Sequence, residues 1–408
     1  MPIKLKNIYF LIVLIFSGLA TCFYRSQPGI IFIFLLSIGT WIYYKKPLKK
    51  SYLRVIGIWL LYCLIVYLRN GELTPFFYFR YVTYITVAYV TINLLRDQLF
   101  YKFERTVYIL AFISLFFYVW QVLSPGSLFQ LARMLDISGE MGRSSVEYRN
   151  FLIFTVENHG AGSMQRNYGF AFEPGTYSVY LTLAMAFNLL RTKMKLSIRQ
   201  NPPLYIMGIA LITTFSTTGY LGLGTLITYL IFKDVKSKAK YVYFLLSLGI
   251  VIFLYFRIDF MQSKINELFI SGQNVEEVID RAAETGNSYS GGRFGGFLIA
   301  WEDFKQRPLF GRGGLSDLTV GATDGGHVAI INGLANILSK LGLFGLIVYL
   351  IALYKSSLGI STIFNSKAIF AIFLVILIGS VAFSIHKQFI LFTFIFYSLF
   401  CNHYKKVQ

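Results

Sequence analysis

Apolar residues occur along this chain in long runs that short polar loops separate. A helix needs roughly 20 apolar residues to cross the hydrocarbon of a bilayer, and twelve runs approach that length. They cover residues 8–24, 29–44, 52–68, 81–95, 106–123, 171–190, 203–215, 219–232, 241–256, 328–354, 368–385 and 388–402. The pattern predicts an all-α polytopic membrane protein, a single helical domain over residues 1–408 with about twelve transmembrane helices.

The two shortest neighbouring runs, 203–215 and 219–232, leave two interpretations open. They form either one long helix broken near Ser216 or a tight hairpin that reaches the outer face. The hairpin is favoured because Pro202 lies at one end and the basic loop at Lys233 at the other. A single span would invert every later segment and carry that basic loop outside, which the positive-inside rule disfavours.

Composition and charge support this threading. The chain is 56% hydrophobic and only 14% charged, with a formal charge of +19. With a cytoplasmic N-terminus, this excess falls entirely on the inner face, and the charges outside sum to zero. Basic clusters such as Lys45–Lys50 and Lys233–Lys240 abut apolar runs, so they are topology signals rather than nucleic-acid patches. Both termini are therefore expected in the cytoplasm, the first helix is expected to be retained, and no nucleic-acid partner is expected.

Metal and disulfide chemistry have no recognisable pattern. The three cysteines, Cys22, Cys63 and Cys401, all fall in predicted spans without paired spacing. The histidines likewise lack partners at metal-ligand spacing. We expect no metal site and no cofactor.

Two long outer loops, 124–170 and 257–327, are the places to seek chemistry. In the second loop, Phe294, Phe297 and Trp301 recur at helical spacing, and Pro308 follows. This predicts an amphipathic helix over 293–307 that lies on the membrane surface or packs over the bundle.

Charged residues at loop ends are the candidate site residues. Arg293 follows two glycines at the start of the predicted helix, where a cation opposes the helix dipole unless an anion binds there. Glu173 precedes Pro174 at the outer mouth of a span. Its carboxylate either favours the helix dipole or acts as a general base for a sugar hydroxyl, and the sequence leaves both interpretations open.

Three segments carry a family resemblance. They are residues 166–177 (RNYGFAFEPGTY), 215–220 (FSTTGY) and 293–314 (RFGGFLIAWEDFKQRPLFGRGG), followed by 332–345. With the twelve-span layout, the chain resembles Wzy-type O-antigen or capsular polysaccharide polymerases, in the wider group that includes O-antigen ligases. The resemblance implies a GT-C-like helical fold, an undecaprenyl-diphosphate-linked oligosaccharide substrate, no metal, and a bacterial inner membrane.

In a reaction of that kind, cations must stabilise the departing diphosphate and a base must accept a proton from the attacking hydroxyl. We assign the diphosphate to Arg293 and Arg166, with Arg312, Arg307 and Arg143 in support, and the base to Glu173 or His327. Sugar contacts are expected from Tyr168, Tyr177 and His159. Membrane lipid, a chain-length regulator and a flippase are the other expected partners.

Two alternatives remain. A ligase would transfer glycan to lipid A-core, but ligases of this group typically have a histidine where this chain has Ile331, and the run at Glu173 is more similar to polymerases. A flippase of lipid-linked saccharides would carry charges within its spans, and here Lys340 is the exception in a span interior.

Overall fold

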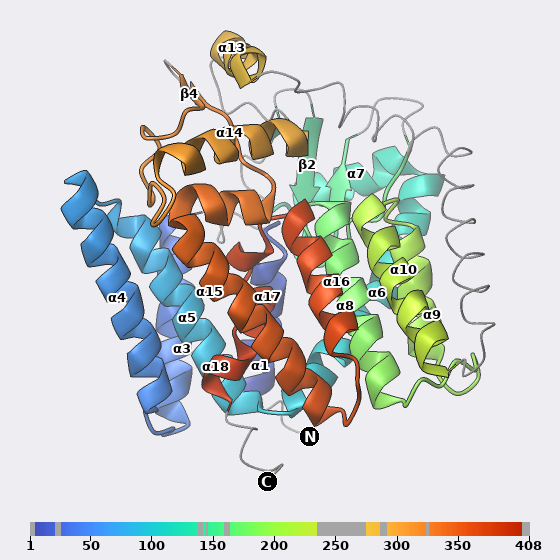
Figure 1. Cartoon of the computed structure of the whole chain (residues 1–408). Helices are drawn as coiled ribbons and strands as arrows, with labels where there is room; N and C mark the ends of the chain where they lie inside the picture. Colours follow the sequence, from blue (N-terminus) through green and yellow to red (C-terminus); the bar gives the residue numbers. More distant parts are fainter. Residues whose placement is uncertain are drawn as a thin grey trace.

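The computed structural model describes residues 5–20, 26–137, 142–143, 146–158, 164–234, 275–285, 292–323 and 326–401 (Figure 1). The predicted span at 241–256 and the first part of the second long loop lie outside these residues. The described chain is mostly helical. Its longer helices run alongside one another as a bundle, and α14 lies across one end of it.

The helices are α1 (Leu5–Ser17), α3 (Gln27–Tyr43), α4 (Lys50–Asn70), α5 (Pro75–Leu95), α6 (Gln98–Leu123), α7 (Pro125–Met134), α8 (Pro174–Arg191), α9 (Pro202–Ile212), α10 (Thr217–Asp234), α13 (Val275–Thr285), α14 (Gly292–Gln306), α15 (Gly333–Ile363), α16 (Ile369–Ala382), α17 (Phe389–Ile395) and α18 (Tyr397–Phe400). Among them, α4, α6 and α15 are long and apolar enough to cross a membrane. Shorter apolar helices are α1, α3, α9 and α16. The prediction of a helical membrane protein is confirmed to this extent, and the number of spans stays a prediction.

Two predicted spans are shorter or more broken than the apolar runs suggest. The run 8–24 stops being helical at Ser17, because residues beyond it pair with another segment: Leu19 forms a β-bridge with Ala171. The run 388–402 is divided into α17 and α18, and Phe396 separates them. Neither α17 nor α18 is long enough alone to cross a bilayer.

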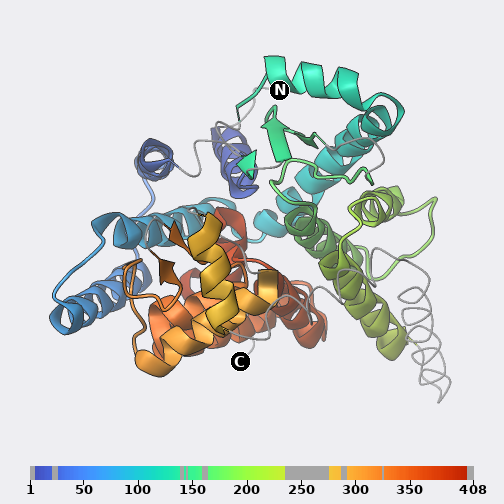
Figure 2. The same cartoon turned by 90° about the horizontal axis from the view of Figure 1, so that it is seen from above.

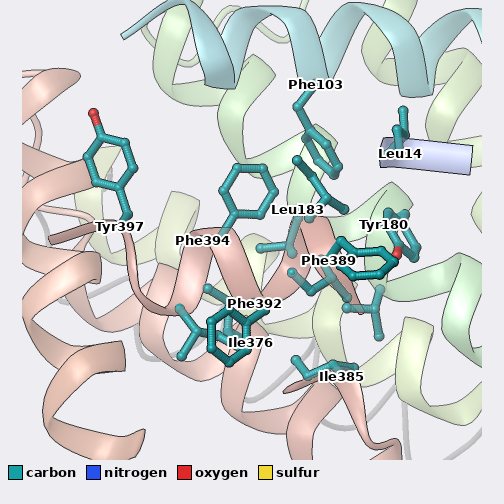
Figure 3. Packing of buried hydrophobic residues seen from close by; sticks show 14 of the residues in the cluster. Leu14, Phe103, Tyr180, Leu183, Ile376, Ile385, Phe389, Phe392, Phe394 and Tyr397 are labelled. Carbon is teal, nitrogen blue, oxygen red and sulfur yellow. The ribbon is translucent and has the colours of Figure 1, made fainter. Parts of the chain in front are cut away.

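The centre of the bundle is α17. All of its residues are buried, and it packs against α5, α1 and α15. Figure 3 shows Phe389, Phe392 and Phe394 from this helix among side chains of other elements, including Phe103 of α6 and Tyr180 of α8. Close packing of large side chains of this kind stabilises helix association, and it would do so in lipid as well, where apolar surroundings offer no hydrophobic driving force.

A hairpin joins α9 to α10, as predicted from the prolines and the basic loop. Asn201 at the start of α9 bonds to Asn188 near the end of α8, so α9 runs antiparallel to α8. Gly219 and Gly222 of α10 contact Ser178 and Thr182 of α8 in the same sequence order, so α10 runs parallel to α8. The two helices are therefore antiparallel to each other, with their turn at 213–216.

The two ends of the bundle differ in charge. One end, here called the basic end, carries the turns between α3 and α4, α5 and α6, and α8 and α9, with residues such as Lys46, Arg96 and Arg199. There the buried Glu104 accepts hydrogen bonds from Arg191 at 2.6 and 2.7 Å. The opposite end, here called the loop end, carries α7, α14 and the strands (Figure 1).

Short strands at the loop end depart from the all-α prediction. Strands β1 (Gly142–Arg143), β2 (Val146–Asn150) and β3 (Thr155–Glu157) form an antiparallel sheet, and β4 (Ala322–Thr323) pairs with β5 (Gly326–His327). From above, α7 and the first sheet lie beside the end of α6, whereas α14 lies over α15 (Figure 2). The 124–170 loop is thus largely an ordered cap.

Helix α14 confirms the predicted helix at 293–307 to within one residue, but its aromatic stripe does not face the bundle. Phe294, Phe297 and Trp301 are each about two-fifths exposed, at 41%, 39% and 43%. The face that packs on α15 carries Ile299 and the fully buried Asp303 instead. Gly296 and the buried Ala300 lie on that inner side of α14, and a methyl group on Gly296 would lie 3.4 Å from the backbone of Ile330. These small residues let α14 lie close to the chain that precedes α15, and the aromatic residues face outward.

A kink divides α15 into an arm along the loop end and a longer segment that descends through the bundle. Gly342 adopts a left-handed backbone there, with φ 64°. The segment 308–313 supplies partners for the backbone groups at the break: Leu343 N donates to Pro308 O at 2.8 Å, and Gly313 N donates to Lys340 O at 2.8 Å. The broken helix is thus hydrogen-bonded by protein, as irregular backbone in a membrane protein must be.

Gly342→Ala tests this packing. The added methyl group would lie 2.5 Å from the carbonyl of Leu309, on a backbone that L-residues rarely adopt. We expect the free energy of unfolding to fall by at least about 2 kcal/mol, measured by thermal unfolding in detergent micelles. Gly359→Ala on the same helix is the matched control, because its methyl group meets no atom within 4 Å. An equal effect of both substitutions would contradict the proposed role of the kink.

Candidate functional site

Arg166 lies where the first long loop meets the hairpin turn. Its Nε donates to Thr214 O and its Nη2 to Phe215 O, each at 3.1 Å. Next to it, the buried Asn167 donates from its backbone N to Thr213 O at 2.9 Å. These bonds satisfy carbonyl groups beyond the end of α9, which explains why two of the three resembling segments, 166–177 and 215–220, lie together.

Glu173 lies close enough to Arg166 to act on it electrostatically, as does Glu157 of β3. Burial lowers the pKa of Arg166, and the two carboxylates oppose that shift. Glu173 occupies the N-cap position of α8, but its half-buried side chain accepts no capping hydrogen bond. The carboxylate is therefore held beside a cation and not used as a cap. We call Glu157, Arg166 and Glu173 the Arg166 cluster.

Aromatic side chains pack next to Glu157 of the Arg166 cluster. Tyr148 donates from its hydroxyl to Glu157 Oε1 at 2.9 Å, and its ring lies 6.2 Å from that of Tyr168 and 5.3 Å from that of Phe172. Tyr168 is 3% exposed, so only an edge of this predicted sugar-contacting residue reaches the surface.

Tyr177, predicted to contact a sugar, lies in the core of the bundle. This side chain is fully buried beneath Gly169, and its hydroxyl is 3.0 Å from Ser114 Oγ of α6. It packs in the core because it lies one turn inside α8, on the face that meets α6. A sugar cannot reach it without displacing that packing.

A second cluster surrounds Asp303 of α14. The buried Asp303 carboxylate accepts hydrogen bonds from Ser339 Oγ at 2.5 Å and Val320 N at 2.8 Å, and both of its oxygens accept from Thr319. Arg312 lies 3.2 Å away through Nε and also donates to Ser339 Oγ at 3.0 Å. Burial lowers the pKa of Arg312, and Asp303 opposes the shift. We call Asp303, Arg312 and Ser339 the Asp303 cluster.

The contacts of Arg312 are structural, because its guanidinium holds the loop that follows α14. It is 7% exposed, and its Nη1 donates to Leu315 O at 2.5 Å. Arg307 is half-buried and likewise donates to a loop carbonyl, Leu318 O, at 3.2 Å. Both hold the loop that follows α14.

The other predicted site residues are only partly described. Arg293 lies in the first turn of α14, Arg143 on β1 and His327 on β5, where it pairs with Ala322; their side chains lie outside the description. His159 lies outside the described residues altogether.

The segment 383–388 connects the two clusters. A methyl group on Gly175, two residues after Glu173, would overlap the ring of Phe383, and one on Gly333 would meet the Phe383 carbonyl. Gln388 accepts a hydrogen bond from Tyr180 of α8 at 2.8 Å. The segment 383–388 therefore lies between the start of α8, next to Glu173, and the start of α15. The first part of α15 contributes Ser339 to the Asp303 cluster.

Three cationic residues near this segment were not predicted as site residues: Arg80 on α5, Lys340 on α15 and Lys387. Lys387 lies within electrostatic range of Lys340, Arg80 and Arg312. The neighbouring His386 is 3% exposed; burial, with the added effect of Lys387 and Lys340, lowers its pKa well below the usual range. Of these three, only Lys340 carried a signal in the sequence, because it is a lysine inside an apolar run.

No group of three or more His, Cys, Asp or Glu side chains that could hold a metal ion occurs among the residues with described positions. A surface hollow lined by Lys102 and Arg105 lies between α1 and α6, at the basic end and away from both clusters. A scan against protein-family models and a search of curated proteins each find no match to this chain.

Asp303→Asn tests the Asp303 cluster. Removing the carboxylate charge leaves Arg312 buried without its counter-ion, which costs roughly 3–5 kcal/mol of unfolding free energy. Thermal unfolding in detergent would measure this loss. The control is Asp317→Asn in the same loop, since Asp317 is exposed. Similar stability of both variants would show that the buried pair does not hold the loop.

Proposed function

We propose that this chain is a glycan polymerase of the Wzy type, which joins undecaprenyl-diphosphate-linked oligosaccharide repeat units on the outer face of a bacterial inner membrane. In this proposal the chain has about twelve spans and a GT-C-like fold. The basic end, with both termini, faces the cytoplasm, and the loop end faces outward. The substrates would enter from the membrane, where their lipid parts remain.

The observation that carries the proposal is the placement of Glu173 beside Arg166 at the loop end. A half-buried carboxylate beside a cation at the start of a helix has the chemistry of a general base that accepts a proton from a hydroxyl group. The cation beside it belongs to another segment of the resembling sequence, and both face the end that carries the ordered loops. His327 remains the second candidate for the base.

The chemistry assigned to these groups is one glycosyl transfer. The terminal hydroxyl of one lipid-linked repeat gives its proton to Glu173, and its oxygen forms a bond to the anomeric carbon of the donor glycan. The bond from that carbon to the diphosphate breaks, and the lipid diphosphate leaves with the electron pair. Arg166 and Arg293 would stabilise the developing negative charge, as oriented cations do in phosphate-releasing reactions.

A transporter of lipid-linked saccharides is the second candidate. Arg80 on α5 and Lys340 on α15 are cationic residues within helices, and charges in such positions mark substrate paths in transporters. A ligase that transfers glycan to lipid A-core uses the same donor, so its product distinguishes it from a polymerase.

Glu173→Gln tests the proposed base. We expect chain growth to fall by a factor of about 10²–10⁴, because glutamine keeps the shape but cannot accept the proton. The purified protein would be reconstituted with its undecaprenyl-diphosphate-linked repeat, with and without lipid A-core, and the products sized. Wild type should give a ladder of lengthened lipid-linked chains. Arg293→Ala should also lose the ladder.

Residues of the same types outside both clusters, the half-buried Glu302 and the exposed Arg133, provide matched controls. Glu302→Gln removes a partner of Lys305 on the surface of α14, and Arg133→Ala removes an exposed residue of α7. Both variants should keep the ladder. A full ladder from Glu173→Gln would reject Glu173 as the base. Transfer to lipid A-core without a ladder would make the protein a ligase, and translocation without any product would make it a transporter.

A further inference from the structure

Three segments far apart in sequence bring basic side chains together at the loop end. Arg80 comes from α5, Lys340 from the arm of α15, and His386 and Lys387 from the segment that follows α16. Lys340 lies within electrostatic range of Arg80, and both lie within range of Lys387. Arg312, on the loop after α14, acts on Lys340 as well. We call Arg80, Lys340, His386 and Lys387 the Lys340 cluster.

Backbone contacts fix this arrangement. The loop after α14 packs on α5, because a methyl group on Gly314 would lie 2.5 Å from Phe77. The same loop bonds to Lys340 through Gly313 N. The Lys340 ammonium lies 5.6 Å from the centre of the Phe77 ring, and the Arg80 guanidinium lies 5.0 Å from the centre of the Phe76 ring. The two cations thus lie on successive rings of one helix.

Carboxylates do not balance these cations. Among the residues that the structure describes, neither Arg80 nor Lys340 forms an ion pair. Asp303 acts on Lys340 electrostatically, but its oxygens already accept bonds from Arg312, Ser339 and Thr319. Burying cations without counter-ions is costly, and cation–π contacts offset only part of that cost.

Buried hydrogen-bonding atoms without partners lie at the same place. Within the described part of the chain, the buried Nε of Arg80, Nε2 of His386 and Nε2 of Gln388 have no hydrogen-bond partner. His386 and Gln388 are 3% and 1% exposed. Buried polar groups without partners are rare in native proteins, and each needs an explanation such as a bound ligand.

We propose that the Lys340 cluster binds a diphosphate group, with Arg80 and Lys340 as its principal cationic contacts and His386 as a hydrogen-bonding partner. Several fixed cations and donors match the multiple oxygens of such an anion. Leu343 and Phe344, just beyond the kink, are 39% and 38% exposed, so a lipid chain has apolar surface beside the cluster. This inference rests on the proposed function, and it adds the Lys340 cluster to Arg166 and Arg293 as a contact for the diphosphate of a lipid-linked substrate.

If the Lys340 cluster binds a diphosphate, replacing one of its cations should weaken diphosphate binding without lowering the stability of the protein. Equilibrium binding of farnesyl diphosphate to the full-length protein in lipid nanodiscs would be measured for wild type, Arg80→Met and Lys340→Met. Each substitution should raise the Kd about tenfold or more, the cost of one charge-assisted contact. Both unliganded variants should melt at or above the wild-type temperature, because each loses an unbalanced cation.

The control is Lys355→Met, an exposed lysine on the same helix, which should leave the Kd unchanged. Arg80→Lys, which keeps the charge, should bind more tightly than Arg80→Met. Inorganic pyrophosphate as competitor separates the sources: competition at similar concentration assigns the affinity to the diphosphate alone, and much weaker competition assigns part of it to the lipid chain. An unchanged Kd in both methionine variants would overturn the inference, as would lowered melting with an unchanged Kd.

The same variants separate this inference from the proposed polymerase. A wild-type ladder together with unchanged binding in Arg80→Met and Lys340→Met would reject the diphosphate site and leave the polymerase. Tenfold weaker binding in both variants, with no ladder from wild type, would support the anion site and reject the polymerase.

Discussion

The contact between two glycine-containing backbones at the loop end is the constraint on which the site depends. Gly311 and Gly342 approach so closely that a side chain on either would overlap main-chain atoms of the other segment, and both have a left-handed backbone. This contact breaks α15, supplies hydrogen bonds at the break and fixes the loop that carries Arg312. It therefore sets where Lys340, two residues before Gly342, lies relative to α5. Only glycine allows this approach at such a φ value.

The three clusters differ in how far nearby carboxylates balance their cations. In the Asp303 cluster the carboxylate and Arg312 form a buried ion pair, which stabilises the loop after α14. In the Arg166 cluster, Glu157 and Glu173 lie beside a guanidinium that also bonds to the turn of the α9–α10 hairpin. In the Lys340 cluster, Arg80 and Lys340 form no ion pair among the described residues. The proposed reaction needs a cation for the anion and a carboxylate for the proton, and the Lys340 and Arg166 clusters lie at the same end of this bundle.

The apolar runs predicted the described helices because hydrophobic length is a local property. The resembling segments likewise predicted that Arg166 and Glu173 belong together, since only six residues separate them. A local sequence pattern does not show which segments contact one another in the fold. Helix α1 ends at Ser17 because Leu19 pairs with Ala171. Tyr177 is buried because α6 covers it. Arg80, Lys340 and Lys387 are distant in sequence, and a charge near the end of an apolar run resembles an ordinary interfacial residue. Their convergence depends on the kink, which a single glycine in a long apolar run does not reveal.

The orientation of the bundle is the central claim, because every proposed reaction requires the loop end to face outward. Gly126→Cys at the start of α7 and Arg199→Cys between α8 and α9 introduce exposed thiols at opposite ends. Each would be placed in a chain in which Cys22, Cys63 and Cys401 are replaced, and intact cells would be treated with a membrane-impermeant maleimide. The account predicts labelling of Cys at position 126 in intact cells and of Cys at position 199 only after permeabilisation. The reverse pattern would place the clusters in the cytoplasm and contradict the account.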